Sequence, residues 1–221
     1  MESGTSLVEE VGMRFLAALA FGLVTVGSAG AARADHYIHT SSAQVDHAWG
    51  IGLRTASQGL ENDSDDDTLQ MDGGGIHVRW RYAPRWSVEL SLEGLHAELY
   101  DGAYSRDLQN STITFGYHFT PYHRWDWSIL LGIGGTDDKV DYRRADGTMA
   151  TENAEEINIM FGAGVEYRWT HIGVGADFRA VGYARTDEED QPADYDPAYD
   201  YRAIPSGQHG GQLNLHFTYY F

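Results

Sequence analysis

The sequence predicts an all-β protein, specifically an eight-stranded antiparallel transmembrane up-and-down β-barrel. From residue 47 onward, hydrophobic residues recur with a period of two, and no segment sustains the period of 3.6 that marks an amphipathic helix. Short and long connections between the alternating segments follow one another strictly. The tryptophans gather beside the short connections. Together, these three observations favour a transmembrane barrel over a soluble β-protein.

Eight segments carry the alternating pattern, and we expect each of them to form a strand. The final segment shows the pattern most clearly, because apolar residues occupy every second position from Leu213 to Phe221. An even number of strands allows an antiparallel sheet to close with both chain ends on one side. The expected strands cover residues 47–55, 73–82, 86–99, 110–119, 125–136, 155–169, 171–183 and 211–221.

The connections between these segments differ in length in a regular way. The short ones comprise residues 83–85, residues 120–124 and Thr170, and the long ones comprise residues 56–72, 100–109, 137–154 and 184–210. Strict alternation places all short turns at one end of a barrel. Transmembrane barrels have this arrangement, with short periplasmic turns and long extracellular loops. A soluble sandwich or lipocalin would share the period of two but would not need this asymmetry.

Aromatic residues indicate where the barrel meets the membrane surface. The six tryptophans fall beside the short turns or at the start of the first strand, where an interfacial girdle is expected: Trp49, Trp80, Trp86, Trp125, Trp127 and Trp169. Four tyrosines are expected to mark the opposite rim: Tyr100, Tyr104, Tyr142 and Tyr183. Packing in a soluble core would instead scatter the tryptophans along the barrel.

The first 34 residues have the features of a cleaved secretory signal peptide. An apolar run at residues 15–26 follows Arg14, and an A-x-A motif at residues 32–34 marks the expected cleavage site. Because acidic residues precede Met13, we expect translation to begin there. The apolar run is too short to span a bilayer comfortably as a helix. The expected organisation is a signal peptide over 1–34, a periplasmic segment over 35–46 and the barrel over 47–221.

Composition excludes several classes of function. The 221 residues carry 15 basic and 33 acidic side chains, a formal net charge of −18, so the protein should repel nucleic acid. The absence of cysteine excludes disulfides, thiolate metal sites and cysteine nucleophiles. The histidines lack the H-E-x-x-H spacing of zinc hydrolases, and we expect neither metal catalysis nor a cofactor.

Two segments resemble a known family. Residues 162–169 form a glycine-rich strand that ends in an aromatic turn, and the last strand ends in Tyr219-Tyr220-Phe221. Here the chain resembles the small outer-membrane β-barrel proteins of Gram-negative bacteria, which include the eight-stranded OmpA-type, OmpX-type and opacity-protein barrels. The resemblance implies contact with outer-membrane lipid and lipopolysaccharide, and recognition of Phe221 by the barrel-assembly machinery. We expect a monomer without the periplasmic peptidoglycan-binding domain of OmpA-type proteins.

Alternation assigns ten charged side chains to the barrel lumen, five of each sign. A balanced set predicts an ion-pair network that plugs the lumen, because a buried charge is tolerated only beside a hydrogen-bonded partner of opposite sign. A bulge at Gly94 or around residues 73–75 would change the inward assignment. The expected network comprises Arg54, Arg79, Arg81, Glu89, Glu93, Asp126, Glu166, Arg168, Asp177 and Arg179.

The function expected from this pattern is non-enzymatic, namely a structural or surface-interaction role for a barrel with a plugged lumen. A narrow passive pore for ions or small solutes is the first alternative. A lipid-modifying enzyme is the second, and it would need a serine, a histidine and an orienting acid on the lipid side. Because Ser87, Ser91, Ser128, His118 and His216 are expected to point inward, we expect no catalytic residue.

Acidic residues concentrate in the long connections. Asp63, Asp65 and Asp67 in the first are candidates for holding a divalent cation through carboxylate oxygens. Their spacing does not fit an EF-hand, however, because Thr68 occupies the position of the required glycine, so solvated acidic loops are the simpler interpretation. Three tyrosines between residues 195 and 201 could contact an extracellular ligand that the sequence does not identify.

Overall fold

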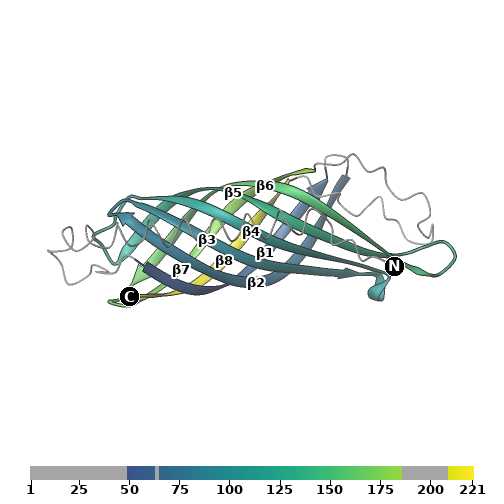
Figure 1. Cartoon of the computed structure of the whole chain (residues 1–221), viewed down its shortest axis with the longest axis horizontal. Helices are drawn as coiled ribbons and strands as arrows, with labels where there is room; N and C mark the ends of the chain where they lie inside the picture. Colours follow the sequence, from purple (N-terminus) through teal and green to yellow (C-terminus); the bar gives the residue numbers. More distant parts are fainter. Residues whose placement is uncertain (1–48, 63–64, 186–208) are drawn as a thin grey trace, which may run out of the picture. The chain divides into compact units, whose positions relative to one another are not determined.

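A computed structural model describes residues 49–62, 65–185 and 209–221, which form a closed antiparallel barrel of eight strands (Figure 1). The elements are β1 (Trp49–Asn62), β2 (Asp65–Ala83), β3 (Trp86–Leu99), the short 3-10 helix η1 (Tyr100–Gly102), β4 (Tyr104–His118), β5 (Trp125–Arg143), β6 (Met149–Arg168), β7 (Ile172–Arg185) and β8 (His209–Tyr220). Each strand pairs with its neighbour in sequence, and β8 closes the barrel against β1. The predicted fold class is confirmed.

Several sequence predictions concern residues outside these ranges. The predicted signal peptide, the segment 35–46, Asp63 and the tyrosines between residues 195 and 201 all lie outside the described residues. Within the described ranges, no helix is long and apolar enough to cross a membrane.

The strands are longer than the alternating pattern predicts. The expected loop at residues 56–72 belongs mostly to β1 and β2, and the expected loop at 100–109 consists mainly of η1 and the start of β4. The expected loop at 137–154 shrinks to residues 144–148 between β5 and β6. These segments look like loops in the sequence because their outward residues are polar, although their backbone continues the same ladder of hydrogen bonds.

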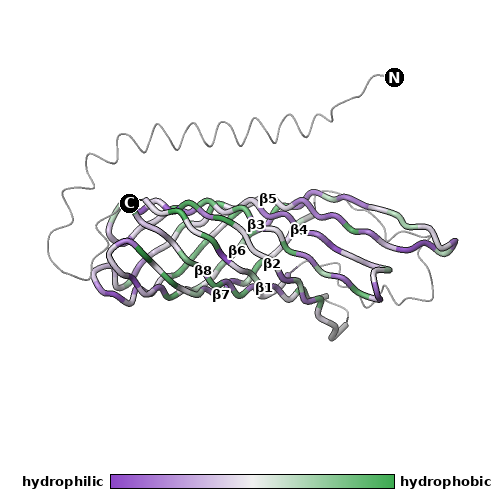
Figure 2. The backbone as a smooth tube through the Cα atoms, turned by 90° about the horizontal axis from the view of Figure 1, so that it is seen from below, coloured by the Kyte–Doolittle hydropathy of each residue, from purple (hydrophilic) through white to green (hydrophobic). Residues whose placement is uncertain are grey.

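The sense of the alternation reverses along the barrel, and β3 shows the reversal clearly. Up to this point the apolar residue faces outward and the charged one inward: Leu92 is 50 % exposed and Glu93 is buried. Beyond it the order is reversed, because Leu95 is 2 % exposed and His96 points outward. Figure 2 shows hydrophilic residues gathering toward the end of the barrel that carries the long hairpins. The last large apolar residues on the outer surface before this reversal are Leu53, Ile76, Leu92, Ile113, Ile133, Ile157, Phe178 and Leu213.

These outward apolar residues divide the barrel into two parts. We call the part between them and the short turns the turn-side half, and the remainder the hairpin-side half. The hairpin-side interior contains most of an apolar cluster, which Met160 extends into the turn-side half: Ala56, Leu60, Leu69, Met71, Leu95, Ala97, Tyr104, Leu108, Tyr142, Ala150, Met160, Val181 and Tyr183. Polar and charged side chains are buried beside it, among them Gln58, Arg106, Asn110, Asp138 and Glu156. A polar exterior around an apolar cluster is the pattern of a barrel surrounded by water.

The tyrosines expected to form a second outer girdle lie elsewhere. Tyr104, Tyr142 and Tyr183 are buried in the apolar cluster, and Tyr100 of these four alone is exposed, in η1. The expectation was wrong for the three buried residues. The strands continue beyond the last outward apolar residues, and in this continuation the apolar side chains point into the barrel.

The glycine-rich segments keep a regular register. β2 and β3 pair without a shift from Asp72↔His96 to Trp80↔Val88, so neither Gly94 nor residues 73–75 form a bulge. The shifts in this region lie between Trp80 and Ala83 and between Glu61 and Asn62. Regular pairing preserves the inward and outward assignment along β2 and β3.

The tip of the β5–β6 hairpin is a compact turn. Asp146 accepts hydrogen bonds from the backbone nitrogen of Thr148 at 2.9 Å and from its hydroxyl at 2.6 Å. The Thr148 side chain and backbone thereby lower the pKa of the Asp146 carboxyl below its ordinary value. Gly147 has a φ of 83°, a backbone conformation that favours glycine.

Candidate functional site

The ten charged residues assigned to the lumen all lie inside the turn-side half and its junction with the apolar cluster. Nine are buried, and Arg81, close to the short turns, keeps 11 % of its side chain exposed. They come from β1, β2, β3, β5, β6 and β7, and β4 and β8 add neutral polar and histidine side chains between them. The lumen therefore contains a continuous network of charged and polar groups.

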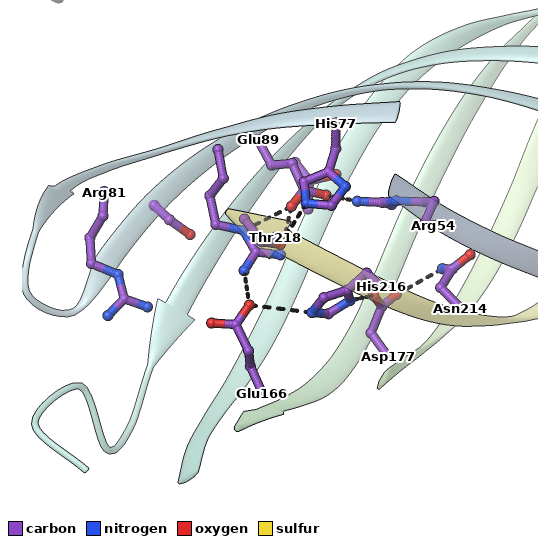
Figure 3. Close-up of polar contacts among 12 residues, drawn as sticks. Arg54, His77, Arg81, Glu89, Glu166, Asp177, Asn214, His216 and Thr218 are labelled. Atoms are coloured by element: carbon purple, nitrogen blue, oxygen red, sulfur yellow. Dashed lines mark hydrogen bonds and ion pairs between the residues drawn. The ribbon is translucent and has the colours of Figure 1, made fainter. Parts of the chain in front are cut away.

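Glu89 on β3 is the centre of this network (Figure 3). Arg54 donates a short hydrogen bond to one carboxylate oxygen, and Arg79 Nε donates to the other at 2.8 Å. Arg179 Nη2 lies 3.6 Å from the first oxygen. Three guanidinium groups thus surround one buried carboxylate, so removing Glu89 would leave several positive charges without compensation.

Arg54 connects Glu89 to Glu93, two inward positions farther along β3. Arg54 Nη1 donates to Glu93 Oε1 at 2.8 Å, and Gln212 Nε2 donates to Glu93 Oε2 at 2.8 Å. Both Glu93 oxygens therefore have donors, one from β1 and one from the adjacent strand β8. Hydrogen bonds between side chains thus connect β3 with β1 and β8 across the lumen at this level.

A second carboxylate centre lies nearer the short turns. Glu166 accepts hydrogen bonds from Arg79 Nη1 at 2.6 Å and from the Tyr220 hydroxyl at 2.8 Å. Arg168 Nε contacts the same carboxylate, and Arg168 Nη2 lies 2.9 Å from Asp126. Arg79 reaches both Glu89 and Glu166, which couples the two centres.

The third cluster joins β7 to β8. Arg179 Nε donates to Asp177 at 2.5 Å, and Asn214 Nδ2 donates to the same oxygen at 2.8 Å. His216 places its two ring nitrogens 3.3 Å from Glu166 and 3.5 Å from Asp177 (Figure 3). His216 therefore links the second and third clusters.

Several residues of the network are not among those predicted from the sequence. His77, Gln212 and Asn214 are buried and bonded within it, and the same alternation that identified their charged neighbours would have assigned them inward. Arg106 and Asp138 were missed because they fell in predicted loops. In the structure Arg106 donates to both Asp138 oxygens, at 3.0 and 2.7 Å, within the hairpin-side half.

A small cavity lies within the turn-side lumen. It lies between Arg79, Glu89, Asp126, Glu166 and Arg179, and the volume that the centre of a water molecule can occupy there is about 20 Å³. A single water needs about 10 to 15 Å³ on this measure. The cavity is thus suited to an isolated water bridging polar groups, and far too small for a file of hydrated ions.

Ser87, His118 and Asp126 form a hydrogen-bonded row beside this cavity. Ser87 Oγ lies 2.9 Å from His118 Nε2, and His118 Nδ1 lies 2.8 Å from Asp126 Oδ2. The order is that of nucleophile, base and orienting acid in serine hydrolases. The sequence pattern placed these residues inside the barrel, but only the pairing of β3, β4 and β5 brings them together. Arg81 also donates to Asp126, at 2.8 Å.

The six tryptophans surround the short-turn end of the barrel. Trp49 and Trp80 stack with ring centroids 5.5 Å apart. Four others point outward and are about half exposed: Trp86, Trp125, Trp127 and Trp169. At the same end, the backbone nitrogen of Phe221 donates to the carbonyl oxygen of Trp49 at 3.0 Å, and the Phe221 side chain is exposed.

The acidic candidates for a cation site lie at the start of β2 or just before it in the sequence. Asp65 and Asp67 lie on β2, and Asp63 lies outside the described residues. In the described part of the chain, no group of three or more histidine and carboxylate side chains has an arrangement that could hold a metal ion.

The chain matches a known protein family in sequence. The sequence profile of the family described as "Outer membrane protein beta-barrel domain" matches residues 17–221. No curated protein matches the chain in sequence.

Solved structures of outer-membrane proteins are similar to the chain at low sequence identity. The crystal structure of Neisserial surface protein A is similar with a TM-score of 0.52 and 11 % identity, over 79 % of this chain and 97 % of that chain. Ail, the attachment invasion locus protein of Yersinia pestis, is similar with a TM-score of 0.49 and 15 % identity, over 78 % of this chain and 97 % of that chain. At these identities the similarity concerns the fold alone.

Proposed function

Because the chain belongs to the outer-membrane β-barrel protein family, we propose that it is a non-enzymatic barrel with a structural or surface-interaction role and a closed lumen. The observation that carries the proposal is the filling of the interior at two levels. The turn-side lumen is bridged by the network around Glu89 and Glu166, and the hairpin-side interior is filled by the apolar cluster and by buried polar side chains such as Arg106 and Asp138.

Each level blocks passage for a different physical reason. An ion entering the turn-side lumen would have to displace ion pairs whose partners are buried and bonded to one another. An ion entering the hairpin-side half would have to pass the packed apolar cluster, where the loss of hydration is costly. The proposed closure therefore does not depend on the network alone.

The proposal includes assembly as a monomer through the C-terminal strand. β8 presents the outward apolar series that ends in the exposed Phe221, next to the first strand that it must join. This end of the chain supports recognition by the barrel-assembly machinery. Contact with outer-membrane lipid and lipopolysaccharide follows from the outward apolar band.

Planar-bilayer recording tests the closed lumen. We expect the refolded protein to insert without discrete conductance steps. Arg79→Ala, which removes the side chain between Glu89 and Glu166, should also remain silent because the apolar cluster stays in place. Regular conductance steps from the unsubstituted protein would contradict the proposal and favour a narrow pore. Migration on unheated gels confirms that each sample is a folded barrel.

One observation favours a second candidate, a hydrolase, namely the row formed by Ser87, His118 and Asp126. An activated serine hydroxyl should react with a fluorophosphonate probe, in which Ser87 Oγ displaces fluoride and its proton passes to His118. Intact-mass analysis measures the adduct, and Ser128→Ala is the matched control for Ser87→Ala. Because Ser87 is 4 % exposed and the adjacent cavity holds only about one water, we expect no adduct. An adduct that disappears in Ser87→Ala but not in Ser128→Ala would favour the hydrolase.

A further inference from the structure

The three short turns of the barrel share one detailed arrangement. The residue immediately before the following strand is Arg85 in the β2–β3 turn, Arg124 in the β4–β5 turn and His171 in the β6–β7 turn. In each turn, the carbonyl oxygen of this residue accepts a hydrogen bond of 2.8 Å from a neighbouring strand. The donors are the backbone nitrogens of His118, Arg168 and Tyr220, respectively.

The side chains repeat as well. Arg85 Nη1 donates to the Tyr117 hydroxyl at 2.9 Å, and Arg124 Nη1 lies 3.4 Å from the Tyr167 hydroxyl. In both cases the tyrosine immediately precedes the residue whose backbone nitrogen binds the turn. At the third turn, the His171 ring stacks on Tyr219, with centroids 6.0 Å apart. Each turn thus presents a cationic or imidazole group against an outward tyrosine.

Aromatic rings flank the two arginine–tyrosine pairs. Trp86 and Phe119 lie 5.0 and 5.3 Å from the Tyr117 ring, measured between centroids. Trp125 and Trp169 lie 4.9 and 4.7 Å from the Tyr167 ring. All four contacts are edge-to-face, so each tyrosine is held in an aromatic wall with its hydroxyl beside a guanidinium group.

The charge of this rim is opposite to that of the protein. The whole chain has a formal charge of −18, but residues 82–86, 119–125 and 169–172, all described by the structure, contain no acidic residue. Arg85 and Arg124 are exposed within them. The acidic residue nearest to the β4–β5 turn, Asp126, is buried in the lumen, where it pairs with Arg81 and Arg168. An anion approaching from the membrane therefore meets two exposed guanidinium groups.

We propose that the Arg85–Tyr117 and Arg124–Tyr167 pairs are two equivalent binding sites for the phosphate of a glycerophospholipid in the periplasmic leaflet of the outer membrane. Arginine carries five N–H donors in a planar fork that matches a phosphate, and its bond to tyrosine occupies only one of them. The tyrosine hydroxyl adds a donor, and the flanking rings lie at the depth where aromatic side chains contact headgroups and upper acyl chains. The inference does not depend on whether the lumen is closed.

Native mass spectrometry of the refolded full chain, released from detergent with dioleoylphosphatidylglycerol, tests the two sites. We expect up to two tightly held lipids on the unsubstituted protein. Arg85→Gln and Arg124→Gln should each remove one of them, and the double variant should remove both, with at least a tenfold rise in the dissociation constant at each altered site. Tyr117→Phe, which keeps the ring, should weaken one site by a smaller factor.

Arg144→Gln is the matched control, because Arg144 is exposed in the hairpin at the opposite end of the barrel. It should retain both lipids. The proposal is overturned if the double variant holds as many lipids as the unsubstituted protein, or if Arg144→Gln loses as many as the double variant. Displacement of the lipids by millimolar inorganic phosphate would also overturn it, because the site would then select a free anion. Unheated gels verify that every variant is folded.

Discussion

The two halves of the barrel differ in the kind of side chain that dominates the interior. The turn-side half holds the charged network inside and apolar residues outside, whereas the hairpin-side half holds the apolar cluster inside and polar residues outside. The backbone is continuous through both, with the same antiparallel pairing and the same inward positions. The difference therefore reflects the surroundings of each half, lipid for one and water for the other.

The comparison teaches what drives the packing in each half. In water, burial of apolar surface stabilises the hairpin-side interior, as in any soluble domain. In lipid that driving force is absent for the outer surface, so the turn-side half is held by its hydrogen-bond ladder and by side-chain bonds across the lumen. Four substitutions sharpen this contrast, beginning with the largest expected effect.

Glu89→Ala should have the largest effect, because Arg54 and Arg79 would remain buried without their shared partner. Removing one partner of a buried ion pair lowers the free energy of unfolding by about 3 to 5 kcal/mol. Urea unfolding in lipid vesicles, followed by tryptophan fluorescence, measures the loss. Glu98→Ala on the outward face of the same strand is the control, and equal losses for the two variants would contradict a central role for Glu89.

Leu108→Ala should destabilise the hairpin-side half by about 2 to 4 kcal/mol, because the side chain is buried in the apolar cluster and leaves a cavity. Limited proteolysis of this half reports the effect locally. Leu92→Ala, on the outer surface, should change protease resistance much less. If both leucine variants behaved alike, the hairpin-side interior would not be a packed core.

The Arg106 and Asp138 pair should be replaceable as a unit. Each partner compensates the buried charge of the other, so the double variant Arg106→Leu and Asp138→Leu should stay within about 1 kcal/mol of the unsubstituted stability, whereas Asp138→Leu alone should be clearly less stable. Urea unfolding of the three proteins gives the comparison. A large loss in the double variant would mean that this half also depends on an ion-pair network.

The His96 and Asp107 pair should matter least. Their side chains are 54 % and 42 % exposed, and exposed ion pairs contribute roughly 0 to 1 kcal/mol. Asp107→Asn should therefore change unfolding by less than about 1 kcal/mol, and 0.5 M salt should remove even that difference. A salt-insensitive loss above this level would place the pair in a less polar environment than water.

The sequence was sufficient for the turn-side half and insufficient for the hairpin-side half. Alternation from Ser87 to Glu93 identifies inward residues correctly because the outward positions in lipid are all apolar. Beyond Gly94 the outward residues are polar, and polar stretches such as 137–154 resemble loops when only apolar residues are counted. The reversal, in which apolar side chains turn inward, is apparent only from the structure. There β4 and β5 remain paired, and Tyr104 and Tyr142 lie opposite each other in the interior.

The candidate site was predictable in composition but not in connectivity. Periodicity supplies the ten inward charges, yet it cannot show that Arg79 joins Glu89 to Glu166, or that Ser87, His118 and Asp126 lie in one row. These contacts depend on the register between strands far apart in sequence and on side-chain conformations that fill a narrow lumen. Their identification requires the closed barrel.

Site-directed spin labelling on β3 tests most directly the claim that the two halves lie in different solvents. The chain contains no cysteine, so Leu92→Cys and His96→Cys each provide a single labelling site, about 13 Å apart along the strand and both facing outward. In lipid vesicles, the nitroxide at position 92 should be relaxed mainly by oxygen, and that at position 96 mainly by a water-soluble nickel complex. Equal protection of both positions from nickel would contradict the account.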